Sequence, residues 1–334
     1  MNFIIPKGYK SPQSIKDTEI TIKEIKDFFE RSLAKELHLT RVSAPLFVKS
    51  NSGLNDNLNG VERPVSFGIK EQNDETVEIV HSLAKWKRLA LKRYEFDHGD
   101  GLYTDMSAIR RDEDTDNIHS IYVDQWDWEK IIHKSERTDE VLEATVNRIY
   151  NALKSTEALM ESKYGIEPIL PEHISFITSQ ELEDRYPKCS AKEREYNIAK
   201  EKKAVFIKQI GGVLTSGEKH DGRAPDYDDW TLNGDIIVYY PILDIALELS
   251  SMGIRVDEEA LSNQLKISGC EERGNLPFQK ALLNGELPYT IGGGIGQSRI
   301  CMFFMRRAHI GEVQASIWPD ETIAYAKSKD INLL

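Results

Sequence analysis

Residues 109–129, IRRDEDTDNIHSIYVDQWDWE, are the stretch that says most about the fold and about a possible site. An arginine pair and an acidic loop precede a strand, which we expect over 118–128. Because alternate side chains of a strand share a face, Gln125, Asp127 and Glu129 should lie together. Most charge runs are solvated surfaces, but the flanking arginines and tryptophans favour a polar site here. The opposite face of this strand should carry Asp124, Trp126 and Trp128.

A glycine-rich segment, GGGIGQSRICMFFM, occupies residues 292–305. Glycines without side chains let a backbone approach a ligand closely. Arg299 then falls in the first turn of an apolar helix, which we expect near 299–307. The segment does not match the phosphate-binding loop GxxxxGK[ST], and a glycine turn before a buried helix is the alternative interpretation.

Two carboxylates, Asp235 and Glu248, lie in apolar segments, where an unpaired charge is expensive. Oxygen ligands of this kind suit Mg²⁺, which takes one or two carboxylates together with substrate phosphates. Ion pairing, for instance with Arg255, explains the two carboxylates equally well. Upstream, HSLAKWKR places Ser82 and Lys87 near an expected helix start, where they bind phosphate or carboxylate or belong to an ordinary basic surface.

The composition is that of an ordinary globular protein, with 334 residues, 40% of them hydrophobic and 29% charged. The formal net charge of −12 disfavours general binding to DNA or RNA, which usually needs a basic excess. The 3 cysteines form no CxxC pair, so no disulfide framework or zinc site is implied and a reducing cytoplasm fits. No apolar run approaches the ~20 residues that span a bilayer.

Helices and strands mix without strict βαβ alternation, which favours an α+β fold with a largely antiparallel sheet flanked by helices. Residues 211–234 are rich in Gly and Asp and should form a long loop, of a kind that is more often functional than idle. A shorter loop is expected at 51–60, and Pro45 should interrupt a strand at 39–48. The other expected elements are helices at 14–37, 83–94, 136–164 and 191–203, strands at 77–80, 173–178, 204–210 and 235–243, and a further segment at 247–256.

Taken in order, these segments resemble the three signature motifs of class II aminoacyl-tRNA synthetases. RVSAPLFV resembles motif 1, whose strand ends in a proline at the dimer interface. The stretch at 109–129 is similar to motif 2, most of all to that of the aspartyl and asparaginyl enzymes, and GGGIGQSR resembles motif 3. Those relatives carry an anticodon-binding barrel before motif 1, whereas 40 residues precede it here. We therefore expect a single catalytic domain over 1–334, without an anticodon-binding domain.

A narrower resemblance is carried by VHSLAKWKR, GLYTDM, VDQWDW, HDGRAPDYDDW, LNGDI, ELSSMGIRVD and IGGGIGQSR. Together they are similar to the ammonia-dependent aspartate–ammonia ligases, the asparagine synthetase A type, from about residue 15 to 320. That family makes L-asparagine from L-aspartate, ammonia and ATP through a β-aspartyl adenylate, and it releases AMP and diphosphate. The resemblance implies Mg²⁺ and a cytoplasmic homodimer, with neither tRNA nor a membrane as partner.

The resemblance also implies roles for individual residues. Arg110, in motif 2, should grip the α-phosphate and the reacting carboxylate. Arg299, in motif 3, should lie against the adenine or reach the γ-phosphate. Asp235 and Glu248 should hold Mg²⁺ on the phosphates.

The substrate aspartate, ammonium and the nucleotide are assigned by the same resemblance. Asp56 and Gln125 are candidates to hold or deprotonate ammonium. Arg223, Asp226, Asp228 and Asp229 lie in the long loop, which is expected to close over ATP. The expected aspartate contacts are Ser82, Lys87, Gln125, Asp127 and Ser251, and the expected nucleotide contacts are Arg110, Arg223, Asp228, Gly294 and Arg299.

One local departure concerns the long loop, because between Asp229 and Leu232 the family can carry a longer insertion than the WT found here. Two other functions stay open at this point. One is a synthetase-like paralogue that binds tRNA or regulates without turnover, which the intact arginine and carboxylate set argues against. The other is an enzyme that adenylates aspartate or a similar acid but transfers it to another acceptor. Glutamine is not expected as nitrogen donor, because no cysteine lies in a glutaminase-like segment.

Overall fold

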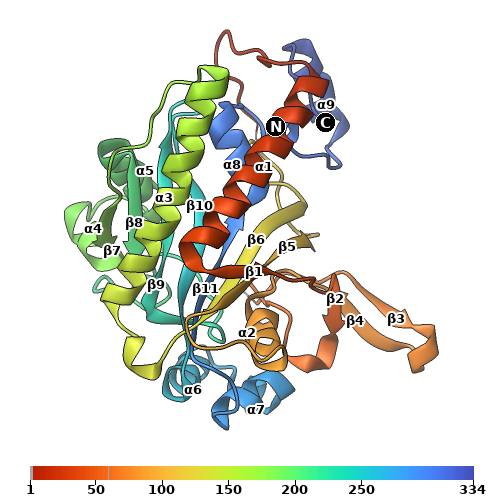
Figure 1. The fold of residues 1–334 in the computed structure, drawn as a ribbon, viewed down its shortest axis with the longest axis vertical. Helices are drawn as coiled ribbons and strands as arrows, with labels where there is room; N and C mark the ends of the chain where they lie inside the picture. Colours follow the sequence, from red (N-terminus) through yellow and green to blue (C-terminus); the bar gives the residue numbers. More distant parts are fainter. Residues whose placement is uncertain (1–2, 59) are drawn as a thin grey trace.

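An eight-stranded sheet forms the centre of the computed structural model, which describes residues 3–58 and 60–334 (Figure 1). The two outermost pairs of strands run parallel, and the pairs between them run antiparallel. The expected α+β fold on a largely antiparallel sheet is therefore confirmed. In spatial order the strands are β1 (Leu39–Arg41), β5 (Gly101–Ile109), β6 (Tyr122–Ile131), β11 (Thr290–Gly296), β10 (Ile245–Arg255), β9 (Asp228–Tyr240), β8 (Ala204–Lys208) and β7 (Ser175–Thr178).

One face of this sheet is covered by α1 (Ile15–Leu37), α3 (Asp139–Tyr164) and α8 (Gln297–Met305), as Figure 1 shows. Their apolar sides bury against the sheet, where the indoles of Trp126 and Trp128 lie in the main core. α1 begins after Ser14, whose hydroxyl accepts the amide of Asp17, and α3 ends at Gly165 in the left-handed conformation. The helices expected over 14–37 and 136–164 are confirmed.

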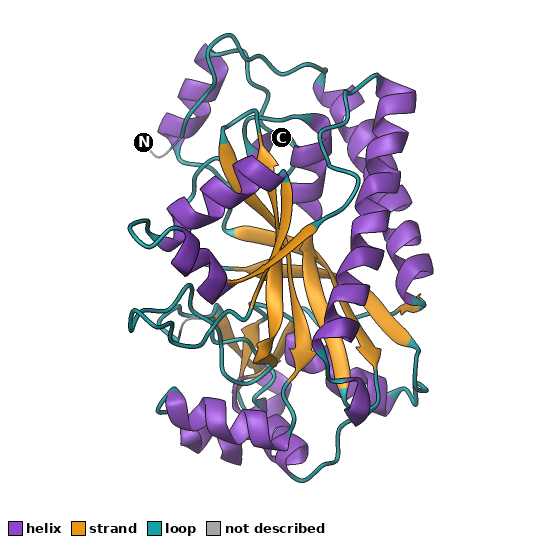
Figure 2. Ribbon diagram, turned by 90° about the vertical axis from the view of Figure 1, so that its left-hand side faces the viewer, coloured by secondary structure: helices purple, strands orange, loops and turns teal. Residues whose placement is uncertain are grey.

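The opposite face of the sheet also carries helices, at its two sides. Figure 2 shows the sheet and its helices turned by 90° from the view of Figure 1. α2 (Ala84–Arg93) packs on β6 and β11, which confirms the expected helix at 83–94. α4 (Ser179–Arg185) and α5 (Ala191–Lys202) pack on β7, β8 and β9, where they form a second apolar cluster. The remaining helices of the described chain are α6 (Glu258–Ile267), α7 (Pro277–Leu283) and α9 (Asp320–Ser328).

A small second sheet projects from the body as an arm (Figure 1). Its strands are β2 (Phe47–Lys49), β4 (Glu75–Ile79) and β3 (Ser66–Ile69). The interruption expected at Pro45 within 39–48 is confirmed, but the two parts do not belong to one strand, because β1 lies in the large sheet and β2 in the arm. Pro45 lies between them and has no backbone N–H to donate to a strand ladder.

Near the centre of the sheet one further expectation needs correction, and one alternative interpretation is excluded. The long loop ends earlier than 234, because β9 already begins at Asp228, which pairs with Arg255 of β10. The WT dipeptide lies within the bounds of this strand, at an irregularity where the register with β10 shifts between Asp228 and Asn233. The glycine segment is a strand, β11, hydrogen-bonded on both sides, and not a turn. In residues 3–58 and 60–334 no helix combines the length and the apolarity that crossing a membrane requires.

Candidate active site

A cavity of about 400 Å³ opens on the sheet face opposite α1 and α3. Its walls come from segments far apart in the chain: the loop after β2, the start of α2, β6, the loop before β9, and β10, β11 and α8. Most of the predicted site residues are thus brought together, but Asp235 and the loop residues Asp226 and Asp229 do not themselves line the cavity. Those that line it are Asp56, Ser82, Lys87, Arg110, Gln125, Asp127, Arg223, Asp228, Glu248, Ser251, Gly294 and Arg299.

The cavity floor is made by β6 and β11. Long polar side chains of β6 lie against glycines of β11. Gln125 and Asp127 face the cavity, while Trp126 and Trp128 lie in the core, so the predicted alternation along 125–129 is confirmed. A Cβ on Gly294 would lie 2.6 Å from the amide oxygen of Gln125 and 2.8 Å from an oxygen of Asp127. This glycine therefore makes room for polar side chains of the neighbouring strand as well as for a ligand.

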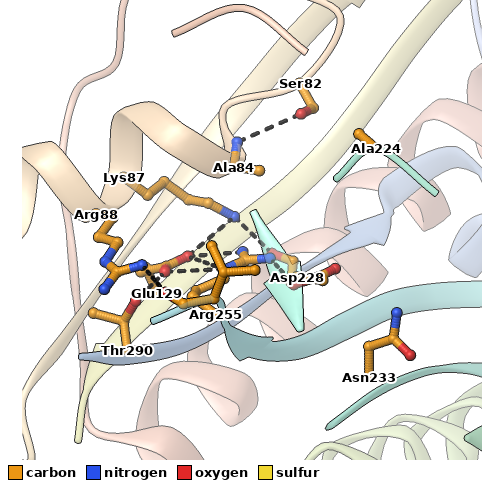
Figure 3. Close-up of polar contacts among 12 residues, drawn as sticks. Ser82, Ala84, Lys87, Arg88, Glu129, Ala224, Asp228, Asn233, Arg255 and Thr290 are labelled. Atoms are coloured by element: carbon orange, nitrogen blue, oxygen red, sulfur yellow. Dashed lines mark hydrogen bonds and ion pairs between the residues drawn. The ribbon is translucent and has the colours of Figure 1, made fainter. Parts of the chain in front are cut away.

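Lys87 reaches the floor of the cavity from α2 and joins a buried group of charges (Figure 3). Its ammonium donates to the carbonyl of Gly293 at 2.9 Å and lies 3.4 Å from Asp127 and 3.9 Å from Glu129. Burial lowers the pKa of this lysine, and the two carboxylates oppose that effect. The lysine is therefore held in place by fixed partners, as a substrate-binding cation should be.

Arg255 of β10 is a cavity residue that the sequence analysis did not assign to the site. Two nitrogens of its guanidinium, Nη2 and Nε, donate to Glu129 at 2.8 and 3.0 Å, and the third, Nη1, pairs with Asp228 (Figure 3). The suggested pairing of Arg255 with Asp235 or Glu248 is wrong. A signal existed, because Ser251 and Arg255 are four residues apart on one strand and so share a face.

This buried charge group predicts a stability effect that depends on pH. Burial by itself would raise the pKa of Glu129, but Arg255 and Lys87 hold the pKa below its ordinary value. Thr290 also donates to this carboxylate, at 2.7 Å. Thr290→Val keeps the shape and removes that bond, so it should lower the free energy of unfolding at pH 7 by about 1.5–3 kcal/mol.

The sign with pH follows from the lowered pKa. The Glu129 carboxylate contributes stability above the ordinary value of 4.5, and this contribution is lost as the pH falls below it. The deficit of Thr290→Val in urea unfolding should therefore be full at pH 7 and shrink below about pH 4. The matched control is Thr156→Val, since Thr156 donates to a neutral carbonyl. A deficit that grows in acid would contradict the account.

Asp56 lies beside Ser82, just before the start of α2, and its side chain is buried, with 3% of the residue exposed. One carboxylate oxygen accepts the hydroxyl of Ser82 at 2.8 Å, and the other accepts the amide of Leu58 at 2.9 Å. Its carbonyl also lies 3.0 Å from a ring nitrogen of His81. The loop expected at 51–60 is confirmed apart from Asn59, which lies outside the described residues. Asp56 is thus a fixed carboxylate in the cavity wall.

Asp235 and Glu248 reach the same face of the sheet because of a β-bulge. Asp235 pairs with Ser251, and the register shifts between Glu248 and Ser250. A shift of one residue turns a side chain to the other face, so Glu248 and Ser251 share the cavity face although they are three residues apart. Simple alternation along 247–256 does not predict this arrangement.

The two carboxylates fit a divalent cation. Asp235 is buried, and one of its oxygens has no partner within residues 3–58 and 60–334. Its other oxygen pairs with Arg223, which lines the cavity. Burial raises the pKa of Asp235 to about 6, with Arg223 opposing the rise and Glu248 adding to it. A cation beside the open oxygen would satisfy this carboxylate, and oxygen donors of this kind suit Mg²⁺.

The two motif arginines lie at the cavity wall. Arg299 donates to the carbonyl of Glu248 at 3.1 Å and lies 3.9 Å from the carboxylate of that residue. Arg110 lines the cavity, and its buried Nε has no partner in the described part of the chain. A buried guanidinium nitrogen without a partner is costly, which suits a group that is satisfied by an anionic ligand.

Comparison with known proteins decides the family. The family model for aspartate–ammonia ligase matches residues 16–330. The chain belongs to the aspartate–ammonia ligase family. It is 69% identical over 331 residues to the aspartate–ammonia ligase of Clostridium perfringens, covering 99% of this chain and 98% of that one. It is 65% identical over 336 residues to that of Ruminiclostridium cellulolyticum, covering 100% of both. Membership in this family makes the protein an enzyme of the ligase class.

Solved structures extend the likeness to the fold. Asparaginyl-tRNA synthetase from Entamoeba histolytica, solved with asparaginyl-adenylate, matches with a TM-score of 0.64 over 90% of this chain and 66% of that chain. Its sequence is 13% identical, so the likeness concerns the fold alone. The expected class II synthetase-like fold is confirmed.

Proposed function

We propose that this enzyme makes L-asparagine from L-aspartate, ammonia and ATP through a β-aspartyl adenylate, and releases AMP and diphosphate. One observation supports this most. The two motif arginines, Arg110 and Arg299, line the same cavity as the fixed carboxylates of Asp56 and Asp127 and a polar floor. Such a site offers cations for phosphate and carboxylate groups and anions for an ammonium group.

The residues at the floor of the cavity bind the substrate aspartate. Asp127 offers a carboxylate to the α-ammonium group, and Lys87 offers a cation to a carboxylate. Ser82, Gln125 and Ser251 supply neutral hydrogen-bonding groups around them. Because Lys87 and Asp127 are already fixed by neighbours, little reorganisation is needed when aspartate binds.

Activation joins an oxygen of the β-carboxylate to the α-phosphorus of ATP and breaks the bond from that phosphorus to the diphosphate. Arg110 neutralises the two negative groups that must meet, and Arg299, Arg223 and Asp228 contact the nucleotide. Asp235 and Glu248 would hold Mg²⁺, which supplies charge neutralisation on the phosphates when it is bound.

Amide formation completes the cycle. Ammonium must lose a proton before its nitrogen attacks the β-carbonyl carbon and displaces AMP. We propose that Asp56 accepts this proton and that Gln125 orients the nitrogen. Both residues line the cavity, and Asp56 is held by Ser82. The free thiols of the 3 cysteines are in keeping with a cytoplasmic site of action.

The test incubates purified protein with ATP, Mg²⁺ and aspartate, and follows asparagine, AMP and ADP. We expect asparagine and AMP in equal amounts when ammonium is added, and no asparagine from glutamine in ammonia-free buffer. ADP with phosphate as products would contradict the proposal. Aspartate-dependent exchange of diphosphate into ATP without asparagine would instead favour an adenylating enzyme with another acceptor.

We also propose a homodimer, on the grounds that motif 1 of class II synthetase-like cores lies at a two-fold interface. A two-fold interface is self-complementary and closes at two subunits. Sedimentation at micromolar concentration should give twice the chain mass of 38.1 kDa. A mass of one chain under those conditions would contradict the dimer.

A further inference from the structure

Three side chains form a buried polar cluster just outside the cavity: Lys85 of α2, Asp226 of the loop before β9, and Gln279 of α7. Their exposed fractions are 2%, 0% and 0%. One oxygen of Asp226 accepts the ammonium of Lys85 at 2.8 Å and the amide nitrogen of Gln279 at 2.7 Å. None of the three lines the cavity.

Each member of the cluster belongs to, or holds, a segment that carries site residues. Lys85 lies between Ser82 and Lys87, and Asp226 lies between Arg223 and Asp228. The cluster thus fixes the start of α2 to the loop before β9.

Gln279 adds the third segment. Its amide nitrogen also donates to the carbonyl of Gly53 at 3.1 Å, three residues before Asp56. Gly53 has φ +74°, and a Cβ there would lie 2.1 Å from the amide oxygen of Gln279. The side chain of Gln279 therefore lies directly against the backbone that leads to Asp56.

Stability alone does not account for this cluster. One oxygen of Asp226 and the amide oxygen of Gln279 are buried without a partner among the described residues. A buried ion pair with unsatisfied atoms stabilises a fold less well than apolar side chains of the same volume. Its value lies in the fixed relation between three segments.

We propose that Gln279 is a positioning residue for the ammonia step, because it joins the loop of Asp56 to Asp226 and Lys85. The proposal rests on the function proposed above for Asp56. Loss of the Gln279 amide removes the hydrogen bond that holds Gly53 and so loosens the start of the 53–58 segment, while the residues of the cavity floor keep their own contacts. The substitution should therefore change the KM for ammonium and leave the KM for aspartate nearly unchanged.

Gln279→Met keeps the length of the side chain and removes both hydrogen bonds. We expect the apparent KM for ammonium to rise by about tenfold, the range of one or two lost buried hydrogen bonds. The KM for aspartate and the aspartate-dependent exchange of diphosphate into ATP should change less than twofold. Hydrogen exchange of the amides at 53–58 should become faster.

Gln264→Met is the matched control. Gln264 is also a buried glutamine, and it donates to the carbonyls of Pro225 and Asp228 at 2.9 Å, so it holds the same loop from α6. It has no hydrogen bond to the 53–58 segment in the described structure. We expect its KM for ammonium to stay at the wild-type value. Gly53→Ala provides a second test from the opposite side of the contact and should reproduce the ammonium effect.

Equal effects on the KM values for ammonium and aspartate, or unchanged exchange at 53–58, would overturn the positioning role. The same holds if Gln264→Met raises the KM for ammonium as much as Gln279→Met does. Failure of the underlying function is distinguishable, because Asp56→Asn would then lack a selective effect while Gln279→Met still speeds hydrogen exchange at 53–58.

Discussion

Arg110→Lys is expected to lower the turnover of asparagine formation by about a hundred- to a thousandfold, or ~3–4 kcal/mol, the usual loss for one preorganised contact to a transition state. Lysine keeps the charge but lacks the planar fork that bridges two anionic groups. The position supports this role, since Arg110 lines the cavity with a buried Nε that has no partner in the described chain. The aspartate-dependent exchange of diphosphate into ATP should fall equally, because activation is the step affected.

The neighbouring arginine is a matched control for this substitution. Arg111 is exposed and does not line the cavity. Arg111→Lys should therefore keep turnover within about twofold of wild type, as surface substitutions usually do. Near wild-type turnover of Arg110→Lys, or an equal loss in both variants, would remove Arg110 from the assigned role.

Asp56→Asn is expected to separate the two half-reactions. Asparagine formation should fall by about a hundred- to ten-thousandfold, the usual contribution of a general base. The exchange of diphosphate into ATP should be kept, since activation precedes the deprotonation of ammonium. Asparagine keeps the size of the side chain; its oxygen accepts the amide of Leu58 and its NH2 group donates to the hydroxyl oxygen of Ser82, so the loop should stay in place.

Both half-reactions are measured on one preparation, which controls for the amount of folded enzyme. Equal loss of exchange and of asparagine formation would show that Asp56 serves binding or activation. Full asparagine formation by Asp56→Asn would remove it from the proton transfer altogether.

Short-range patterns of the sequence predicted the central part of the site well. Gln125 and Asp127 face the cavity and Trp126 faces the core, because a strand with one polar and one apolar face has a single register that buries the indoles. The apolar helix expected near 299–307 is also present, as α8 over Gln297–Met305.

The contacts that depend on the pairing of distant strands were not predictable in this way. The bulge that turns Glu248 toward Asp235 is set by the register of β9 against β10 and leaves no mark in the local pattern. The pairing of Arg255 with Glu129 and Asp228 joins three strands.

The loop and glycine segments also depend on contacts with distant strands, which the local sequence does not show. Asp228 to Gly234 contain loop-forming residues, yet they belong to β9 because Asp228, Asn233 and Gly234 pair with β10 on either side of an irregularity at 229–232. Gly292 to Gly294 suggest a turn in isolation, but a Cβ at Gly292 would lie 2.0 Å from Glu129. Tertiary contacts therefore decide what these residues form.

The central claim is that the β-carboxylate of aspartate is activated as an adenylate in this cavity. Its most direct test uses aspartate labelled with ¹⁸O in the β-carboxylate, together with ATP, Mg²⁺ and ammonium, and determines the label in the products by mass spectrometry. The oxygen that joins the α-phosphorus leaves with AMP when nitrogen attacks the carbonyl carbon. We expect one ¹⁸O atom in each AMP and one in each asparagine. Label in inorganic phosphate with ADP as product, or AMP without label, would contradict the account.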